Sequence, residues 1–341
     1  MRIVMVGIDL GKTVCSLAGL DENGRVVLSK RLRREGVAPF VSSLPVCGVA
    51  MEACCGAHYL GRRLLEAGYE VRLIAPQYVR PYVKSHKNDE RDAEAIAEAA
   101  MRPTMRFVSV KTQAQLDLQT LHRVRERLVE RRTALINQMR GILLERGIMV
   151  AKGKYRLARA LPEILSMDVT KLTPRIRSLL EQLREEWRAL DDRITDLDTE
   201  FVVVARQEET MKRLVEIPGI GALTATALVA AIGKGDAFDS GRDLAAWLGL
   251  VPRQATTGGK PRLLGISKRG NAYVRRLFIH GARAALRYHE GRRTRLGAWL
   301  RGVRERRHRN VAVVALANKL VRIAWAVLRG GVHYTEFVAA K

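Results

Sequence analysis

Residues 87–93, Lys-Asn-Asp-Glu-Arg-Asp-Ala, are the stretch on which the expected fold and site depend, because an alanine-rich helical pattern begins here and continues to about Met101. Asp89 and Asp92 stand three positions apart, so a helix places both carboxylates on one side of its first turn. Acidic residues at this end of a helix also offset the helix dipole, which by itself is enough to explain the pair. A metal-binding interpretation therefore needs further carboxylates elsewhere in the chain.

The N-terminal part of the chain alternates strand patterns with helical patterns. Apolar, period-two segments predict strands over 2–9, 14–20, 25–31, 47–53 and 70–75. Helices are expected over 36–44 and 57–68, and an Asn-Gly turn at 23–24 joins the second and third strands. Three strands in hairpin order, followed by alternating helices and strands, predict a mixed sheet covered by helices. This order is the ribonuclease-H-like arrangement.

Two further carboxylates fall on strands of this sheet. Asp9 ends the first strand and Glu52 lies on the fourth, and in a ribonuclease-H-like sheet the helix with Asp89 and Asp92 covers the same point. Converging carboxylates repel one another unless divalent cations neutralise them, and two Mg²⁺ ions about 3.5–4 Å apart are the usual solution for phosphodiester chemistry. The four residues therefore predict a metal site. Residues 7–11 also resemble the start of actin-like kinases and ATPases, but no further glycine-rich phosphate loop follows.

The charge of the chain indicates a polyanionic partner. Lys and Arg total 60 against 35 Asp and Glu, a formal net charge of +25. Nucleic acid or an anionic membrane can balance such an excess. No uninterrupted apolar run reaches the roughly 18 residues of a membrane span, and the N-terminus enters a strand pattern at once. We therefore expect a cytoplasmic protein that binds nucleic acid.

The cysteines match no zinc-site spacing and are expected to be reduced.

Two long helical patterns follow the sheet. They run over about 112–149 and 174–213, with a short connection between them that contains Gly153 and Pro162. Such a pair is typical of an antiparallel coiled coil, which can serve as an internal spacer or as an oligomerisation arm. The chain is thus predicted to divide into an α/β domain at 1–110, a coiled-coil arm at 111–213 and a mainly helical domain at 214–341.

The C-terminal part opens with Ile-Pro-Gly-Ile-Gly at 217–221, ahead of a helix expected over 222–232. The pattern resembles a helix-hairpin-helix element, in which Gly219 and Gly221 let backbone N–H groups reach a phosphate. The alternative is a glycine-capped connection between two helices.

Residues 252–271 combine two hydroxyls, Thr256 and Thr257, with a following glycine pair and many cations. A flexible glycine loop lets the backbone approach a phosphate, and the cations would stabilise developing negative charge. Over 253–310 there are 17 Lys and Arg against two acidic residues. This section is the expected electrostatic footprint on nucleic acid. The candidate phosphate-contacting residues are Arg253, Lys260, Arg262, Lys268, Arg269, Arg275 and Arg276. The simpler alternative is a basic loop that binds nucleic acid without chemistry.

Taken together, the ordered carboxylates, the Ile-Pro-Gly-Ile-Gly element and the motif Gly-Leu-Val-Pro-Arg-Gln…Thr-Gly-Gly-Lys…Gly-Ile-Ser-Lys-Arg-Gly-Asn resemble the DEDD transposases of the insertion sequence 110 group, in its 1111 branch. The resemblance covers nearly the whole chain. It implies a RuvC-like domain, a coiled-coil arm and a transposase domain with a catalytic serine. It also implies donor and target DNA, a structured guide RNA encoded by some elements, and a tetramer whose carboxylates face the serine of another subunit. The coiled-coil arm by itself suits a dimer or a tetramer.

One position departs from the family pattern. Where the family places its serine, this chain carries Thr257, preceded by Thr256. Threonine can attack phosphorus, but its extra methyl group crowds an in-line approach and restricts χ1. The sequence therefore leaves three functions open: a recombinase that forms a covalent hydroxyl–DNA bond, a RuvC-like nuclease of the Holliday-junction type that uses metal-activated water, and a transposase relative that binds nucleic acid without cleaving it.

Overall fold

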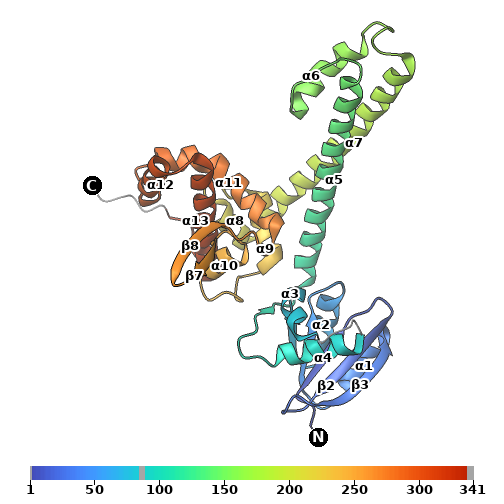
Figure 1. Cartoon of the computed structure of the whole chain (residues 1–341), viewed down its shortest axis with the longest axis vertical. Helices are drawn as coiled ribbons and strands as arrows, with labels where there is room; N and C mark the ends of the chain where they lie inside the picture. The colour runs from blue at the N-terminus through green and yellow to red at the C-terminus, as the bar shows by residue number, and fades with distance from the viewer. Residues whose placement is uncertain (1, 84–88, 336–341) are drawn as a thin grey trace. The chain divides into compact units, whose positions relative to one another are not determined.

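The computed structural model describes residues 2–83 and 89–335, and its contacts divide the chain into two compact units (Figure 1). The first unit spans Met1–Leu116 and the second spans Asp117–Lys341. Lys87 and Asn88, which precede the acidic helix, lie outside the described residues. The predicted α/β domain at 1–110 falls within the first unit. The helices of the predicted arm and the C-terminal helices share the second.

The first unit is built on a six-stranded mixed sheet with the order β3-β2-β1-β4-β5-β6. The central strand β1 is antiparallel to β2 and parallel to β4, and β4 is parallel to β5. This confirms the predicted mixed sheet in the ribonuclease-H-like order; the short last strand was not expected. The strands are β1 (Met5–Asp9), β2 (Val14–Leu20), β3 (Val26–Arg33), β4 (Gly48–Glu52), β5 (Glu70–Ile74) and β6 (Phe107–Val108).

Helices cover both faces of this sheet, and the two-residue period of the strands decides which side chain meets which helix. On β1, Val6 and Ile8 pack into the cluster that contains Val37 of α1 and Leu64 of α2. Met5 packs on the opposite face with the helix α4. The helices of this unit are α1 (Arg34–Ser42), α2 (Ala57–Glu66), the short α3 (Pro76–Val79) and η1 (Arg80–Tyr82), and α4 (Asp89–Ala100).

The helix α4 lies unusually close to the central strand at Gly7. A Cβ atom on Gly7 would lie 2.2 Å from the carbonyl oxygen of Ala93 and 2.9 Å from the Cβ atom of Ala97. Both alanines are completely buried, so small side chains on the two elements are what allow the contact. The first turn of α4 is thereby held beside the end of β1.

In the second unit, α5 (Gln113–Leu144), which begins within the first unit, and α7 (Pro174–Gln207) form an antiparallel pair. Arg125 binds Asp198 at 2.5 Å and Arg132 binds Asp191 at 2.5 Å. A later residue of α5 thus contacts an earlier residue of α7, which shows that the two helices run in opposite directions. The helix α6 (Lys154–Leu165) was missed by the sequence analysis, which treated Gly153 to Pro162 as a connection. Its apolar spacing decides the outcome, because Leu157, Leu161 and Ile164 all pack into the core of the pair.

The remaining helices share a single core in the second unit, and Ile266 at the end of the one hairpin packs against it. The second long helical pattern ends at Gln207 rather than at residue 213, since Glu208 takes an extended conformation before α8 begins. The glycine-rich stretch is a two-stranded hairpin rather than a loop. The elements are α8 (Glu209–Val215), α9 (Ala222–Ile232), α10 (Gly241–Trp247), β7 (Pro252–Thr257), β8 (Lys260–Ile266), α11 (Ala272–Gly291), α12 (Arg295–Arg306) and α13 (Arg309–Gly330).

By length and composition, α13 could cross a membrane, although Lys319 and Arg322 interrupt its apolar run. Half of its most apolar window is buried inside the structure, where Leu316 and Leu320 have no exposed surface. This burial is what the core helix of a globular domain shows.

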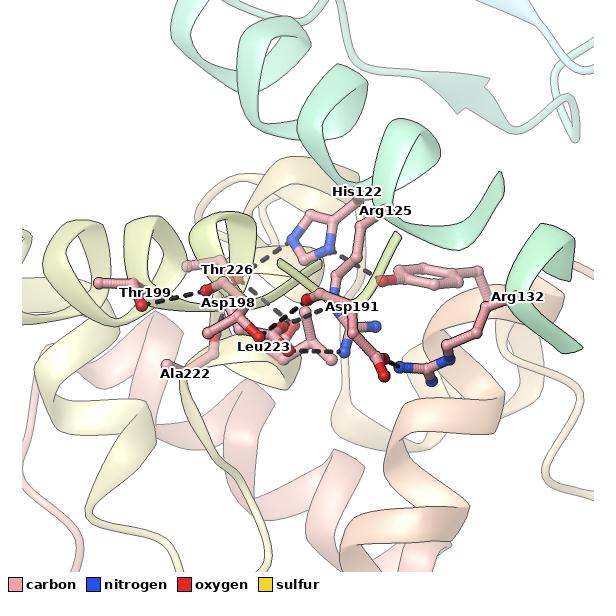
Figure 2. A network of polar contacts seen from close by, with 11 residues as sticks. His122, Arg125, Arg132, Asp191, Asp198, Thr199, Ala222, Leu223 and Thr226 are labelled. Carbon is pink, nitrogen blue, oxygen red and sulfur yellow. Dashed lines mark hydrogen bonds and ion pairs between the residues drawn. The ribbon is translucent and has the colours of Figure 1, made fainter. Parts of the chain in front are cut away.

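A buried polar network ties α5 and α7 to α9 and α11 (Figure 2). His122 of α5 contacts the Tyr273 hydroxyl through Nδ1 at 3.0 Å and the Thr226 hydroxyl through Nε2 at 3.1 Å. Thr226 donates its own proton to the carbonyl oxygen of Ala222, so it accepts from Nε2–H. Nδ1 then accepts from Tyr273, which makes neutral His122 the Nε2–H tautomer.

We predict that Gly7→Val destabilises the first unit by about 1–3 kcal/mol, because the added side chain overlaps the backbone of α4. Chemical denaturation of the two proteins measures the difference. Gly36→Ala in α1 is the control, since nothing lies within 4 Å of a Cβ atom at that position. Equal stability of Gly7→Val and the unmodified chain would contradict the tight contact.

We also predict that acidification weakens the second unit through His122. Burial, with a smaller contribution from Arg125, lowers the pKa of His122 from 6.5 to about 4. The unfolded chain therefore binds the proton first, and the stability contributed by neutral His122 is complete above pH 6.5 and is lost as the pH falls towards 4. The full loss is about 3 kcal/mol, of which about 2 kcal/mol disappears between pH 7 and pH 5.

Urea unfolding at pH 7 and pH 5 measures this loss. His122→Gln is expected to be less stable at pH 7 and to change less between the two values. His280→Gln, at an exposed position of α11, is the matched control and should retain the pH dependence of the unmodified chain. If His122→Gln also retains it, another group is responsible.

Candidate functional site

The sheet places two of the predicted carboxylates at neighbouring strand ends. Asp9 and Glu52 are the last residues of β1 and β4, whose parallel pairing ends with Ile8 opposite Met51. Asp9 lies an even number of residues from Met5 on β1, and Glu52 an even number from Ala50 on β4, so each shares a face with that residue. Met5 and Ala50 both pack in the cluster that contains α4. The alternation of the strands therefore places both acidic residues on the α4 face of the sheet.

The first turn of α4 completes the cluster. Asp9, Asp89 and Asp92 each offer a carboxylate oxygen, and these oxygens all lie within 4.8 Å of one another. Asp89 is exposed, whereas Asp9 and Asp92 are half-buried. Carboxylate oxygens are the ligands that hard divalent cations prefer, and a bound cation would offset the repulsion among three negative charges at this separation. The donor set fits a divalent metal ion.

Glu52 belongs to the same electrostatic neighbourhood, although it is not one of the three clustered residues. Burial raises the pKa of Glu52, and the negative charges of Asp9 and then Asp92 raise it further, while Arg80 opposes them. Each carboxylate close to another disfavours ionisation, so a bound cation would favour the ionised form of Glu52. The structure thus brings the four predicted acidic residues to one end of the sheet, three of them in mutual reach.

Nearby cations were not anticipated from the sequence. Arg31 of β3 lies 3.8 Å from a carboxylate oxygen of Asp89, and both side chains are more than half exposed. Arg80 of η1 affects Glu52, as described above. Neither arginine carries a local signal in the sequence, because each reaches the site through the packing of a different element.

The two threonines lie in the second unit, at the end of the β7–β8 hairpin. Gly258 and Gly259 both take positive φ values, +56° and +74°, which a two-residue hairpin turn requires. Thr257 pairs with Lys260 and Thr256 with Pro261. Every residue of β7 is exposed, so the hairpin presents both of its faces to solvent.

Hairpin geometry separates the two hydroxyls. Directly paired residues share a face, and faces alternate along a strand, so Thr257 shares its face with Lys260 and Arg262. Thr256 is on the opposite face, where its oxygen accepts a hydrogen bond from the Gln254 side chain at 2.9 Å. Only Thr257 stands on the cationic face.

The candidate phosphate-contacting residues differ in exposure and in the partners they already have. Arg253, Lys260, Arg262, Lys268 and Arg269 are exposed on the hairpin or just after it. Arg275 instead donates to the carbonyl oxygens of Leu248 and Arg269, at 2.9 and 2.8 Å, and so holds the turn that follows the hairpin. Arg276 forms an ion pair with Glu126 of α5.

The turn between α8 and α9 packs against α11 and α13 and is held by a hydrogen bond from α11. Gly219 has a φ of +102°, and a Cβ atom there would lie 3.0 Å from both Ala285 and Leu320. The buried His289 donates from Nε2 to the Pro218 carbonyl oxygen at 2.9 Å. Gly221 is exposed at the start of α9, with nothing within 4 Å of a Cβ position. Of the two glycines, Gly221 has the accessible surface that a phosphate would need.

The chain is similar to known transposases over nearly its whole length. Residues 6–147 match a DEDD transposase family model, and residues 211–296 match the model described as "Transposase IS116/IS110/IS902 family". The chain is 47% identical over 326 residues to the transposase for insertion sequence element IS1111A of Coxiella burnetii, covering 96% of this chain and 90% of that protein. It is 46% identical to a probable family 20 transposase of Pseudomonas aeruginosa, covering 96% of this chain and 97% of that protein. With the transposase for IS1328 of Yersinia enterocolitica, the identity is 42% and the coverage 98% and 99%.

The fold, the acidic cluster and these relatives together define the class as the DEDD transposases of insertion sequences. Within that class, the chain belongs to the IS116/IS110/IS902 family, and its relatives include a transposase of IS1111 type.

We predict that Asp92→Asn weakens divalent-metal binding at least tenfold, because it removes one of three clustered anionic ligands. The rise in unfolding temperature with increasing Mn²⁺ or Mg²⁺ measures the affinity. Without metal, losing the repulsion from Asp9 and Asp89 stabilises the variant, while losing the favourable interaction with the helix dipole destabilises it, so the metal-induced rise is the quantity that decides. Glu94→Gln, on the same helix, is the control and should keep the metal-induced rise; a full rise in Asp92→Asn would contradict the site.

Proposed function

We propose that this transposase cleaves and exchanges DNA strands at a metal site formed by Asp9, Asp89 and Asp92, with Glu52 beside them. The observation that carries the proposal is the mutual approach of the three aspartate oxygens to within 4.8 Å. Mg²⁺, as a pair of ions, is the cofactor we expect, since this ion serves most phosphodiester chemistry. When bound, it would neutralise the charge of the scissile phosphate and act as a Lewis acid.

Within this proposal, Thr257 is the nucleophile. Its Oγ1 would form a bond to phosphorus while the phosphodiester bond to the leaving strand breaks; the hydroxyl proton is lost to solvent, and the leaving oxygen gains one. The cationic face of the hairpin supports the assignment, because Lys260 and Arg262 beside Thr257 can hold the phosphate oxygens. Thr256 faces away and already accepts from Gln254.

Binding of nucleic acid would rest on the exposed cations of the second unit. Arg253, Lys260, Arg262, Lys268 and Arg269 are the proposed phosphate contacts, with Gly221 as a backbone contact at the start of α9. Binding through several phosphates releases counterions, so the affinity should fall steeply with salt. Donor DNA and target DNA are the proposed partners, together with a structured RNA encoded by the element.

We further propose that the chain acts in the cytoplasm as a homo-oligomer, a dimer or a tetramer. The antiparallel pair of α5 and α7 suits this role, because it has a core of its own and still exposes apolar side chains such as Leu179 and Val203. The carboxylates and Thr257 belong to different compact units of one chain, which is compatible with a site completed by a second subunit.

The test of this function is the covalent protein–DNA product. We predict that Thr257→Ala loses that product on a denaturing gel, whereas Thr257→Ser keeps or increases it because the hindering methyl group is gone. Thr256→Ala is the matched control and should still form the product. Asp9→Asn should abolish strand exchange in the same assay.

Two other results would favour different functions. Cleavage of DNA without any covalent species in every variant would indicate a RuvC-like nuclease that uses metal-activated water. Salt-sensitive binding of DNA or RNA, with neither cleavage nor joining in Mg²⁺, would indicate a transposase relative that has lost its chemistry, as threonine in place of the family serine would explain.

A further inference from the structure

Arg34, at the first residue of α1, joins two loops that are distant in the sequence. Its guanidinium donates from Nη1 to the carbonyl oxygen of Gly11 at 2.7 Å and from Nη2 to that of Cys55 at 3.2 Å. Its backbone N–H donates to the Thr13 carbonyl oxygen at 2.9 Å. A single side chain therefore links the loop after β1 to the loop after β4.

The loop after β4 is shaped to receive this side chain. Gly56 takes a left-handed φ of +91°, and a Cβ atom there would lie 1.7 Å from Nη2 of Arg34. Only glycine leaves room for the guanidinium at this point while adopting this backbone conformation without strain. The backbone at Gly56 and the guanidinium group of Arg34 are therefore complementary in shape.

The two linked loops are those that follow the strand-end carboxylates. Gly11 comes two residues after Asp9, and Cys55 comes three residues after Glu52. The parallel pairing of β1 with β4 ends at Ile8 and Met51, one residue before both carboxylates. Asp9 still pairs with Ser16 of β2, and Glu52 with Ile74 of β5. Directly between the ends of β1 and β4, the ladder has stopped, and the Arg34 link is the contact that follows it.

We propose that Arg34 is a positioning residue of the metal site: by linking the loops that follow Asp9 and Glu52, it keeps the Asp9 carboxylate in reach of Asp89 and Asp92. This inference rests on the proposed metal-binding function of the carboxylates. Arg34 donates to backbone carbonyl oxygens, so its effect on the ligands passes through the two loops. Outer-shell residues that orient metal ligands typically change metal affinity by about ten- to a hundredfold when replaced, and we take the lower end of this range for Arg34.

The direction of the effect separates positioning from charge. A cation near the site repels a metal ion, so if only the charge of Arg34 mattered, its removal would strengthen metal binding. If Arg34 positions the loops, its removal weakens binding. Arg34→Lys retains the charge but not the planar fork that bridges two carbonyl oxygens, and a positioning role predicts weaker binding here as well.

The experiment measures Mn²⁺ binding to the full-length chain by the electron paramagnetic resonance signal of free Mn²⁺. Arg34→Met and Arg34→Lys are each expected to bind Mn²⁺ at least about tenfold more weakly than the unmodified chain. Arg62→Met is the matched control, because Arg62 of α2 also bridges two acceptors, the Lys111 carbonyl oxygen and the Gln113 side chain, at 2.9 Å each. Neither acceptor belongs to the two loops, so Arg62→Met should keep its Mn²⁺ affinity.

Unchanged or tighter Mn²⁺ binding by Arg34→Met would overturn the inference, whatever happens to the unfolding temperature. Equal weakening in Arg62→Met would overturn it too, since the loss would then be a general consequence of destabilisation. If Arg34→Met does not fold, Arg34→Lys decides by the same criterion. Absence of Mn²⁺ binding by the unmodified chain would overturn the metal site itself, whereas binding that is insensitive to residue 34 would overturn the role of Arg34 alone.

Discussion

The contact of α4 with β1 at Gly7 is the constraint on which the acidic site depends. Asp9 is held by the sheet and Asp92 by the helix, so the distance between their carboxylates is set by how closely the two elements pack. Glycine on the strand and Ala93 and Ala97 on the helix bring the backbones nearer than larger side chains would allow. The site is therefore created by residues that carry no charge and take no part in chemistry. Burying this small-residue interface is favourable, and this free energy opposes the repulsion among the carboxylates. The raised pKa of Glu52 reflects that repulsion together with burial.

Under the proposed function, the chain divides its chemistry between two compact units. The first unit supplies carboxylates at the end of a rigid sheet, where period-two alternation and a helix fix their directions. The second supplies a hydroxyl and cations on an exposed hairpin whose two faces differ. Under the proposed function, each unit holds one half of what strand transfer needs: a place for metal, and a nucleophile with phosphate contacts. A two-stranded ribbon exposed on both faces is only marginally stable in water, which suits a surface that becomes buried against nucleic acid.

The second unit uses buried polar contacts where the first uses small residues. His122 stacks on Phe201 with ring centroids 4.1 Å apart and bonds to Tyr273 and Thr226, so one side chain of α5 contacts three other helices. Arg125 beside it forms two bonds to Asp198 of α7. Such a network is stable only when every member is satisfied, because an unpaired polar group in the interior is costly. It therefore restricts the relative positions of the long helices, α9 and α11 more narrowly than apolar packing alone would.

The sequence by itself determined the first five strands and the mixed sheet, and it predicted the four acidic residues that the structure brings to one end of that sheet, because period-two patterns, turn residues and strand ends are local properties of the chain. The family resemblance added the transposase class, which the comparisons confirm. Tertiary structure alone decided which carboxylates reach one another, which threonine shares a face with the cations, and that Arg275 holds a turn instead of facing solvent. The physical reason is the same in each case. A contact between residues far apart in the chain depends on packing distances and side-chain directions, and no local pattern contains them.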